Sequence, residues 1–100
     1  NIFRKVAARR YFNKEVSDLT LAECTVLASI TSNPSRYNPI TNPENNNTRR
    51  QIVLQNMVDQ NYISKQDMEN ALSDDVYDRI QNVNTATKET NSTTAILPMN

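Results

Sequence analysis

Glycine, histidine and tryptophan are all absent from this chain of 100 residues, and cysteine occurs only once. Without histidine and with a single thiol, Cys24, the chain alone cannot form a Cys/His zinc site, an intrachain disulfide or a histidine-based catalytic triad. No apolar run approaches the ~20 residues that a membrane-spanning helix needs. The 11 Lys and Arg balance the 11 Asp and Glu, so the total charge indicates neither a nucleic-acid partner nor anionic lipid.

The absence of glycine removes the residue that most easily adopts a left-handed backbone, although a chain of this length ordinarily has about seven. Asparagine is the next most tolerant residue in that conformation. Asn13 and Asn61 each follow a segment with helical periodicity. We therefore expect these two asparagines to end helices.

Helical patterns dominate the chain and no strand pattern interrupts them, so the predicted fold class is all-α. Thr20 with Glu23, and Ser64 with Asp67, have the spacing of capping boxes, in which each side chain binds a free amide of the first turn. The apolar residues of the second segment cover much of its circumference, which predicts a buried core helix. The four expected helices span residues 3–12, 20–31, 43–60 and 65–73.

The proline-rich stretch over residues 32–43 is expected to be a loop, because proline removes amide donors and disfavours helix at the residue before it. Asn42 is the expected N-cap of the helix that follows, with Pro43 at its first position. The pattern of that helix places its buried part in the C-terminal half and leaves Asn45–Asn47 polar and exposed. Beyond Ser73 the composition is that of a linker.

Five short segments of this chain resemble, in order, the motifs of the peptidoglycan glycosyltransferases of class A penicillin-binding proteins and monofunctional cell-wall polymerases. The family patterns are Ala-Ala-x-x-Tyr-Phe-Gly-Lys, Leu-Thr-x-x-Glu, Pro-Ser-x-Tyr-Asn-Pro, Arg-Arg-x-x-Val-Leu and Met-x-x-x-Gly-Tyr-Ile-Ser. Two glycines of these patterns correspond to Asn13 and Asn61. The matching segments here are AARRYFNK (7–14), LTLAE (19–23), PSRYNP (34–39), RRQIVL (49–54) and MVDQNYIS (57–64).

The resemblance implies that residues 1–73 are the C-terminal helices of a lysozyme-like glycosyltransferase domain and that residues 74–100 are a largely disordered, flexible linker. The parent domain would polymerise lipid II into glycan strands at the outer face of the bacterial cytoplasmic membrane. In the family, two glutamates and a metal-assisted pyrophosphate site do this chemistry. Both glutamates belong to earlier motifs that this chain lacks, so we expect no catalytic residue, no metal ligand and no cofactor here, with a divalent metal left open for the parent.

The resemblance also implies roles for single residues. Arg49 and Arg50 would either meet the pyrophosphate end of the substrate or brace the cleft wall, and both roles are left open. Glu23 is expected to act as a cap, and Tyr37 and Asn38 to order the proline loop. Cys24 is expected to be a small buried apolar residue.

Two other functions compete with this interpretation. A non-catalytic helical protein-interaction module would use the same helices to bind a partner, and would be monodisperse where an isolated lobe would associate through uncovered apolar surface. A lysozyme-like hydrolase would need a pair of carboxylates. Every acidic residue here has a plainer explanation, which disfavours the hydrolase.

Overall fold

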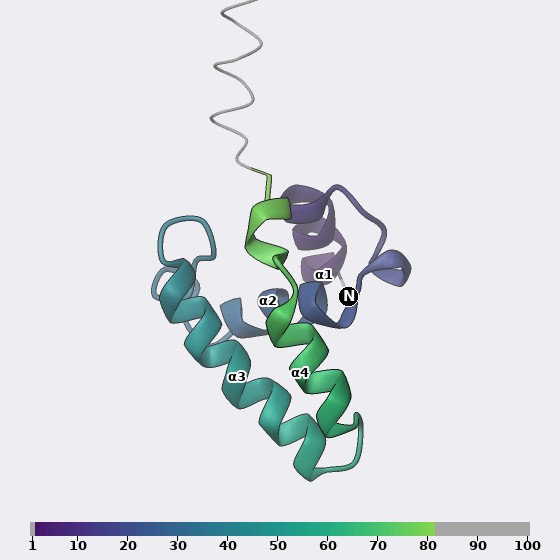
Figure 1. Ribbon diagram of the computed structural model, residues 1–100. Coiled ribbons are helices and arrows are strands. Elements are labelled where there is room, and N and C mark those ends of the chain that lie inside the picture. Colours follow the sequence, from purple (N-terminus) through teal and green to yellow (C-terminus); the bar gives the residue numbers. More distant parts are fainter. Residues whose placement is uncertain (1, 82–100) are drawn as a thin grey trace, which may run out of the picture.

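The computed structural model describes residues 2–81, and these residues contain helices and loops but no strand. The all-α prediction is therefore confirmed, and all four expected helices are present (Figure 1). Within residues 2–81 no helix is both long and apolar enough to cross a bilayer. The remainder of the predicted linker, residues 82–100, lies outside the described residues. The elements are α1 (Ile2–Ala7), η1 (Ala8–Phe12), η2 (Val16–Asp18), α2 (Leu21–Ile30), α3 (Pro43–Asp59), α4 (Lys65–Ser73) and η3 (Val76–Arg79).

The first helix begins as α1 and widens into the π-helical turn η1 before it ends. Asn13 ends it with a φ of 54°, in the left-handed region. The amide of Asn13 donates to the carbonyl of Arg9 at 3.0 Å, and the amide of Lys14 donates to the carbonyl of Ala8 at 3.3 Å. Asn13 therefore ends the first helix, as expected. The bond from Lys14 to Ala8 spans one residue more than the corresponding bond at a usual helix end, because the last turn is π-helical.

Helices α3 and α4 form an antiparallel hairpin whose corner lies at Asn61 (Figure 1). Asn61 has a φ of 64°. The amide of Tyr62 donates to the carbonyl of Met57 at 2.9 Å, and the amide of Asn61 donates to the carbonyl of Val58 at 3.0 Å. These two bonds are the Schellman pattern, in which a left-handed residue lets the chain reverse at a helix end. Asn61 therefore substitutes for glycine, as its place in the sequence predicts.

Replacing Asn61 by alanine should lower the free energy of unfolding by about 1 kcal/mol, because a Cβ without a polar group disfavours positive φ. Replacement by glycine should leave stability unchanged or slightly higher. Urea unfolding of both variants checks this, with Asn56→Ala on the exposed side of α3 as the control. Equal stabilities for Asn61→Ala and Asn61→Gly would contradict the assignment.

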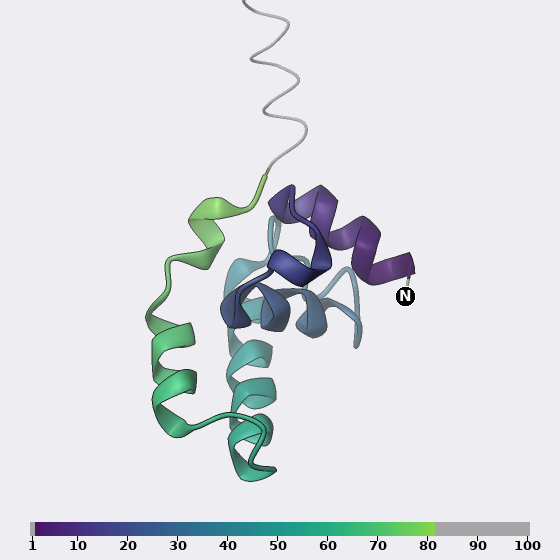
Figure 2. The ribbon, with the colours of Figure 1, turned by 90° about the vertical axis from the view of Figure 1, so that its right-hand side faces the viewer.

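Helix α2 lies at the centre of the molecule, with α1 and η1 on one side and the α3–α4 hairpin on the other (Figures 1 and 2). Both predicted capping boxes are formed, at Thr20 with Glu23 and at Ser64 with Asp67. Seven of the ten residues of α2 are buried, which confirms it as the core helix. The buried apolar core consists of Ala7, Ala8, Phe12, Ala22, Val26, Leu27, Ile30, Leu54, Ala71 and Val76.

The buried stripe of α3 differs from the prediction. It consists of Asn46, Arg50 and Leu54, spaced one helical turn apart, whereas Ile52 is 48% exposed. Two polar side chains can be buried because each finds hydrogen-bond partners on neighbouring elements. The prediction rested on hydrophobicity alone, and it therefore placed the buried part of α3 too far toward the C-terminal end of the helix.

Two smaller predictions also need correction. Asn42 precedes α3, but its side chain makes no capping bond and instead donates to the carbonyl of Ser35 at 3.1 Å. Cys24 is exposed and not part of the core, because the buried face of α2 carries the polar neighbours Glu23 and Thr25 instead.

The folded part of the chain extends beyond Ser73, where the predicted linker begins. Val76 is fully buried, and Tyr77 and Ile80 pack against the core. The amide of Gln81 donates to the carbonyl of Tyr11 at 2.8 Å and so attaches this stretch to η1. Residues 74–81, here called the C-terminal segment, therefore belong to the helical body.

Candidate functional site

Arg50, the second arginine of the Arg-Arg pair, lies inside the molecule where α3 meets α4 and the C-terminal segment. Its side chain is 1% exposed. Nη1 donates to the carbonyl of Ala71 at 3.1 Å, and Nη2 donates to Oδ1 of Asn47 at 3.0 Å. The guanidinium carbon lies 5.5 Å from the centre of the Tyr77 ring, a cation–π distance. Arg50 thus joins three elements through one planar group.

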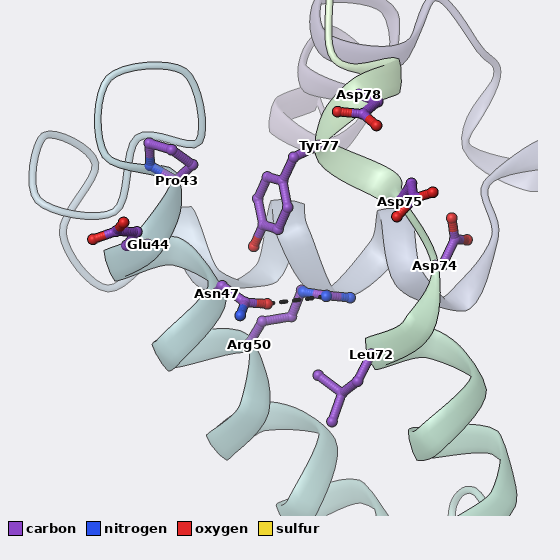
Figure 3. A pocket seen from close by; sticks show the side chains of 9 residues that line it. All are labelled: Pro43, Glu44, Asn47, Arg50, Leu72, Asp74, Asp75, Tyr77 and Asp78. Carbon is purple, nitrogen blue, oxygen red and sulfur yellow. Dashed lines mark hydrogen bonds between the residues drawn. The ribbon is translucent and has the colours of Figure 1, made fainter.

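An open hollow of about 330 Å³ lies beside Arg50, between the start of α3 and the C-terminal segment (Figure 3). Its wall is rich in carboxylates, because Glu44, Asp74, Asp75 and Asp78 all line it. In Figure 3, Tyr77 points from the C-terminal segment toward the Arg50 guanidinium, which lies across the bottom of the hollow. The excess of acidic side chains makes this hollow unsuited to a phosphate or pyrophosphate group.

Asn46 occupies a fully buried position one turn before Arg50. Its side-chain nitrogen donates to the carbonyl of Val26 at 3.2 Å and to the carbonyl of Tyr37 at 2.8 Å. Its Oδ1 accepts a hydrogen bond from the Tyr77 hydroxyl at 2.7 Å. Burial raises the pKa of that hydroxyl. One amide side chain therefore connects α2, the proline loop and the C-terminal segment.

Glu23 has a second role besides capping α2. Its carboxylate is fully buried and accepts from the amide of Thr20 at 2.9 Å, from Nζ of Lys14 at 2.9 Å and from Nε of Arg79 at 3.1 Å. Burial by itself raises the pKa of Glu23, but the Thr20 amide and the two cations outweigh it, so the pKa lies below its ordinary value. Arg79 also forms a two-bond pair with Asp74, whose pKa it lowers.

The lowered pKa of Glu23 predicts how stability varies with pH. The unfolded chain takes up the proton first, so this contribution is complete above the unfolded pKa of about 4.3 and is lost as the pH falls through the folded value. Glu23→Gln, which keeps a capping side chain, should cost about 1–2 kcal/mol at neutral pH. The cost should shrink as the pH falls below about 4.3, because the unfolded wild-type chain is then protonated while the native carboxylate still is not, and it should vanish below the lowered folded pKa.

Urea unfolding from about pH 3 to pH 7 measures this effect. Glu69→Gln, at an exposed position on α4, is the matched control and should change stability little at any pH. A cost for Glu23→Gln that is equal at both ends of the pH range would contradict the role of the charge.

Among residues 2–81, no group of three or more Asp, Glu or Cys side chains could hold a metal ion. Glu23 is the one deeply buried carboxylate of residues 2–81, and it binds two cations and a backbone amide. A glycosyl-transfer reaction needs a carboxylate that is free to exchange a proton or to stabilise charge at the sugar. Glu23 is therefore placed as a structural carboxylate.

A family model described as Transglycosylase matches residues 4–58, more than half of the chain. The chain belongs to the transglycosylase family. It is 46% identical over 79 residues to penicillin-binding protein 1A of Neisseria flavescens, a match that covers 77% of this chain and 10% of that protein. It is 52% identical over 60 residues to penicillin-binding protein 1F of Bacillus subtilis, which covers 60% of this chain and 8% of that protein.

The fold agrees with this assignment. A crystal structure of penicillin-binding protein 1A from Haemophilus influenzae aligns with a TM-score of 0.71 and 27% identity, covering 92% of this chain and 15% of the other. The resemblance to peptidoglycan glycosyltransferases is thereby confirmed. This transglycosylase segment spans about a tenth of the length of the first of these relatives.

The structure does not gather the predicted site residues of the transglycosylase segment into one place. Asn13 and Asn61 end two different helices. Asn38 orders the proline loop, since its Oδ1 accepts from the amides of Ile40 and Thr41 at 2.8 and 3.2 Å. The Tyr37 carbonyl serves as an acceptor for Asn46, as given above. Glu23 and Arg50 are linked through Arg79 and Tyr77 of the C-terminal segment. Tyr37 joins this set through Asn46, which binds both its carbonyl and the Tyr77 hydroxyl.

Sequence analysis missed Asn46, Tyr77, Arg79 and Lys14. A signal existed for Asn46, because asparagine is an unfavourable residue inside a helix and its retention there suggests a specific partner. Tyr77 and Arg79 lie where the helical pattern weakens, so periodicity carried no information about them. Their roles depend on contacts with residues that are 31 and 56 positions away in the chain.

Proposed function

We propose that this chain is a structural part of a transglycosylase domain whose parent protein polymerises lipid II in bacterial cell-wall synthesis. The family match over residues 4–58 carries the proposal. The burial of Arg50 and the occupied carboxylate of Glu23 support a structural role for the chain itself. In the parent, a polymerising site with paired glutamates and a divalent metal would be supplied by other parts of the domain, at the outer face of the cytoplasmic membrane.

The two arginines of the Arg-Arg pair have different roles in this proposal. Arg50 has a structural role: it stabilises the packing of α3 against α4, because its guanidinium is buried and bound to protein acceptors. Arg49 is only half-buried. Its Nε, like the Nε of Arg50, has no hydrogen-bond partner among the described residues. We assign to Arg49 any direct contact with the pyrophosphate end of the substrate, since a guanidinium matches phosphate geometry.

Polymerisation of lipid II by two proteins tests the proposal. The 100-residue chain should be inactive, and a longer protein that includes the two upstream glutamate motifs should form glycan strands. In the longer protein, Arg49→Ala should lower kcat/KM by about tenfold without loss of stability. Activity of the short chain would refute the structural role, and inactivity of a folded longer protein would refute the polymerase assignment.

An apolar groove on this chain is the surface that the rest of the domain would cover. Phe3, Cys24, Leu27, Ala28, Val53 and Met57 line it, and they come from α1, α2 and α3. Helix α2 thus buries most of its circumference inside the chain and presents the remainder to this groove. We propose that preceding residues of the transglycosylase domain pack there, which also makes the alternative of an independent interaction module the weaker one.

Cys24 reports directly on whether the groove is covered. It is exposed in this chain, although partial burial and the nearby charge of Glu23 raise its pKa and slow its reaction with thiol reagents. In the longer protein the rate at Cys24, followed by mass spectrometry at about pH 8, should fall by about tenfold or more. Guanidinium-unfolded samples should react at equal rates. Equal rates in the folded samples would mean that the groove stays open.

A further inference from the structure

Asparagine side chains at the start of α3 hold the proline loop by its backbone. Asn42 and Asn45 make two of these bonds in positions exposed to solvent, whereas Asn46 is fully buried. A hydrogen bond shielded from water is the more costly one to break, so Asn46 is the main attachment of the loop to α3. The side-chain nitrogens of Asn42, Asn45 and Asn46 donate to three consecutive carbonyls, those of Ser35, Arg36 and Tyr37, at 3.1, 3.3 and 2.8 Å.

The side-chain amide of Asn46 satisfies all its partners in only one orientation. Its nitrogen donates to the carbonyls of Val26 and Tyr37, and its oxygen accepts from the Tyr77 hydroxyl. An amide rotated by 180° would place its oxygen against two carbonyl oxygens, which cannot donate. The bond to the proline loop and the bond to the C-terminal segment are therefore made together by one fixed group.

We propose that the proline loop and the C-terminal segment open and close together, with the Asn46 amide as the group that couples them. When the C-terminal segment leaves, the Tyr77 hydroxyl leaves with it, and Oδ1 of Asn46 stays buried without a donor. Turning the amide toward water removes that cost but breaks the bond to the Tyr37 carbonyl. Release of the loop frees the amide in the same way. By linkage, each segment changes the opening of the other by the same factor.

Tyr77 is the member of the C-terminal segment that acts on the loop. It reaches from the segment toward α3 (Figure 3). The other polar bonds of the segment go elsewhere, from Arg79 to Glu23 and from the amide of Gln81 to η1. Tyr77→Phe therefore interrupts the coupling and leaves these attachments in place. The proposal concerns contacts within this chain, so it does not depend on whether the parent polymerises lipid II.

Amide hydrogen exchange of the 100-residue chain, followed by NMR, tests the proposal. The amides of Tyr37 and Asn42 report on the loop, because they donate to loop carbonyls at 3.0 and 2.8 Å. Tyr77→Phe should speed their exchange by about tenfold, since local opening then breaks one buried hydrogen bond fewer. Asn61→Ala is the control, because it lowers overall stability comparably but leaves every bond of Asn46 in place. It should speed the same amides by less than about threefold.

The reverse direction is tested from the loop. Asn38→Ala removes the acceptor of two loop amides and should speed exchange at the amide of Gln81 by about threefold or more. In a chain that already carries Tyr77→Phe, it should have no further effect there. Equal acceleration of the loop amides by Tyr77→Phe and Asn61→Ala would overturn the proposal, because the loop would then open only with the whole chain. An undiminished effect of Asn38→Ala in the Tyr77→Phe chain would also overturn it, since the coupling would then bypass Asn46.

Discussion

A chain that ends after Ser73 is expected to lose about 3–5 kcal/mol of unfolding free energy relative to a chain that ends after Gln81. Full burial of the Val76 side chain contributes about 1.5–3 kcal/mol. Removing Tyr77 leaves the buried Oδ1 of Asn46 without the hydroxyl that now donates to it, and an unsatisfied buried acceptor costs about 1–3 kcal/mol. Small domains have about 5–15 kcal/mol in total, so the shorter chain should be largely unfolded when warmed.

Urea and thermal unfolding of the two truncated chains and of the full 100 residues measure this effect. Tyr77→Phe separates its parts, because it keeps the ring beside Arg50 and removes only the bond to Asn46. It should cost about 1–2 kcal/mol. Equal stability of the chains ending at Ser73 and at Gln81 would show that the C-terminal segment packs without contributing, and would restore the linker boundary that the composition predicts.

Replacing Arg50 by alanine should cost about 3–4 kcal/mol, whereas Arg49→Ala should cost less than about 1 kcal/mol. The Arg50 substitution removes the closer of two donors to the carbonyl of Ala71, which also accepts from the amide of Asp74 at 3.4 Å. It also removes a donor to the side chain of Asn47 and empties the space beside Tyr77. Arg49 is half-buried, and the structure gives it no comparable set of acceptors. Denaturant unfolding of the two variants side by side therefore separates the structural arginine from its neighbour.

Arg50→Lys is the informative conservative variant. Lysine keeps the positive charge but cannot reach both acceptors from one planar group. It should recover less than half of the loss seen for Arg50→Ala. If lysine restored full stability, charge alone would explain the position, and the two-acceptor geometry would be irrelevant.

The residues in these predictions form one connected set of contacts. Arg50 and Asn46 on α3 both contact Tyr77, and Glu23 on α2 contacts Arg79. The C-terminal segment is thus attached to two helices by polar groups that are mostly buried. In a longer transglycosylase protein, this arrangement would fix the direction in which the chain leaves the helical body.

The features that could be predicted from the sequence depend on local geometry. A capping box needs only a Ser or Thr and an acidic residue three positions later, and both boxes are formed. A left-handed helix end in a chain without glycine needs asparagine, and both expected positions have positive φ. In each case the interacting atoms lie within a few residues of one another, so the sequence contains the whole interaction.

The predictions that were wrong concern features that depend on contacts between distant residues. Asn46 and Arg50 are polar, and their burial is favourable because they bind the carbonyls of Val26, Tyr37 and Ala71 and contact Tyr77. The C-terminal segment resembles a linker in composition, yet Val76 is fully buried in a space of the core that distant residues create. No local pattern describes such a space.

The amino-acid sequence by itself determined the helical fold class, both capping boxes and both asparagine helix ends, because these follow from spacing along the chain. Its motifs also carried the resemblance to the family to which the chain belongs. The tertiary structure alone decided that Arg50 is a buried bracing residue, that Glu23 binds two cations and that the folded body continues to Gln81. The physical reason is that burial, ion pairing and surface charge are properties of neighbours in space, and those neighbours are assembled only when the chain folds.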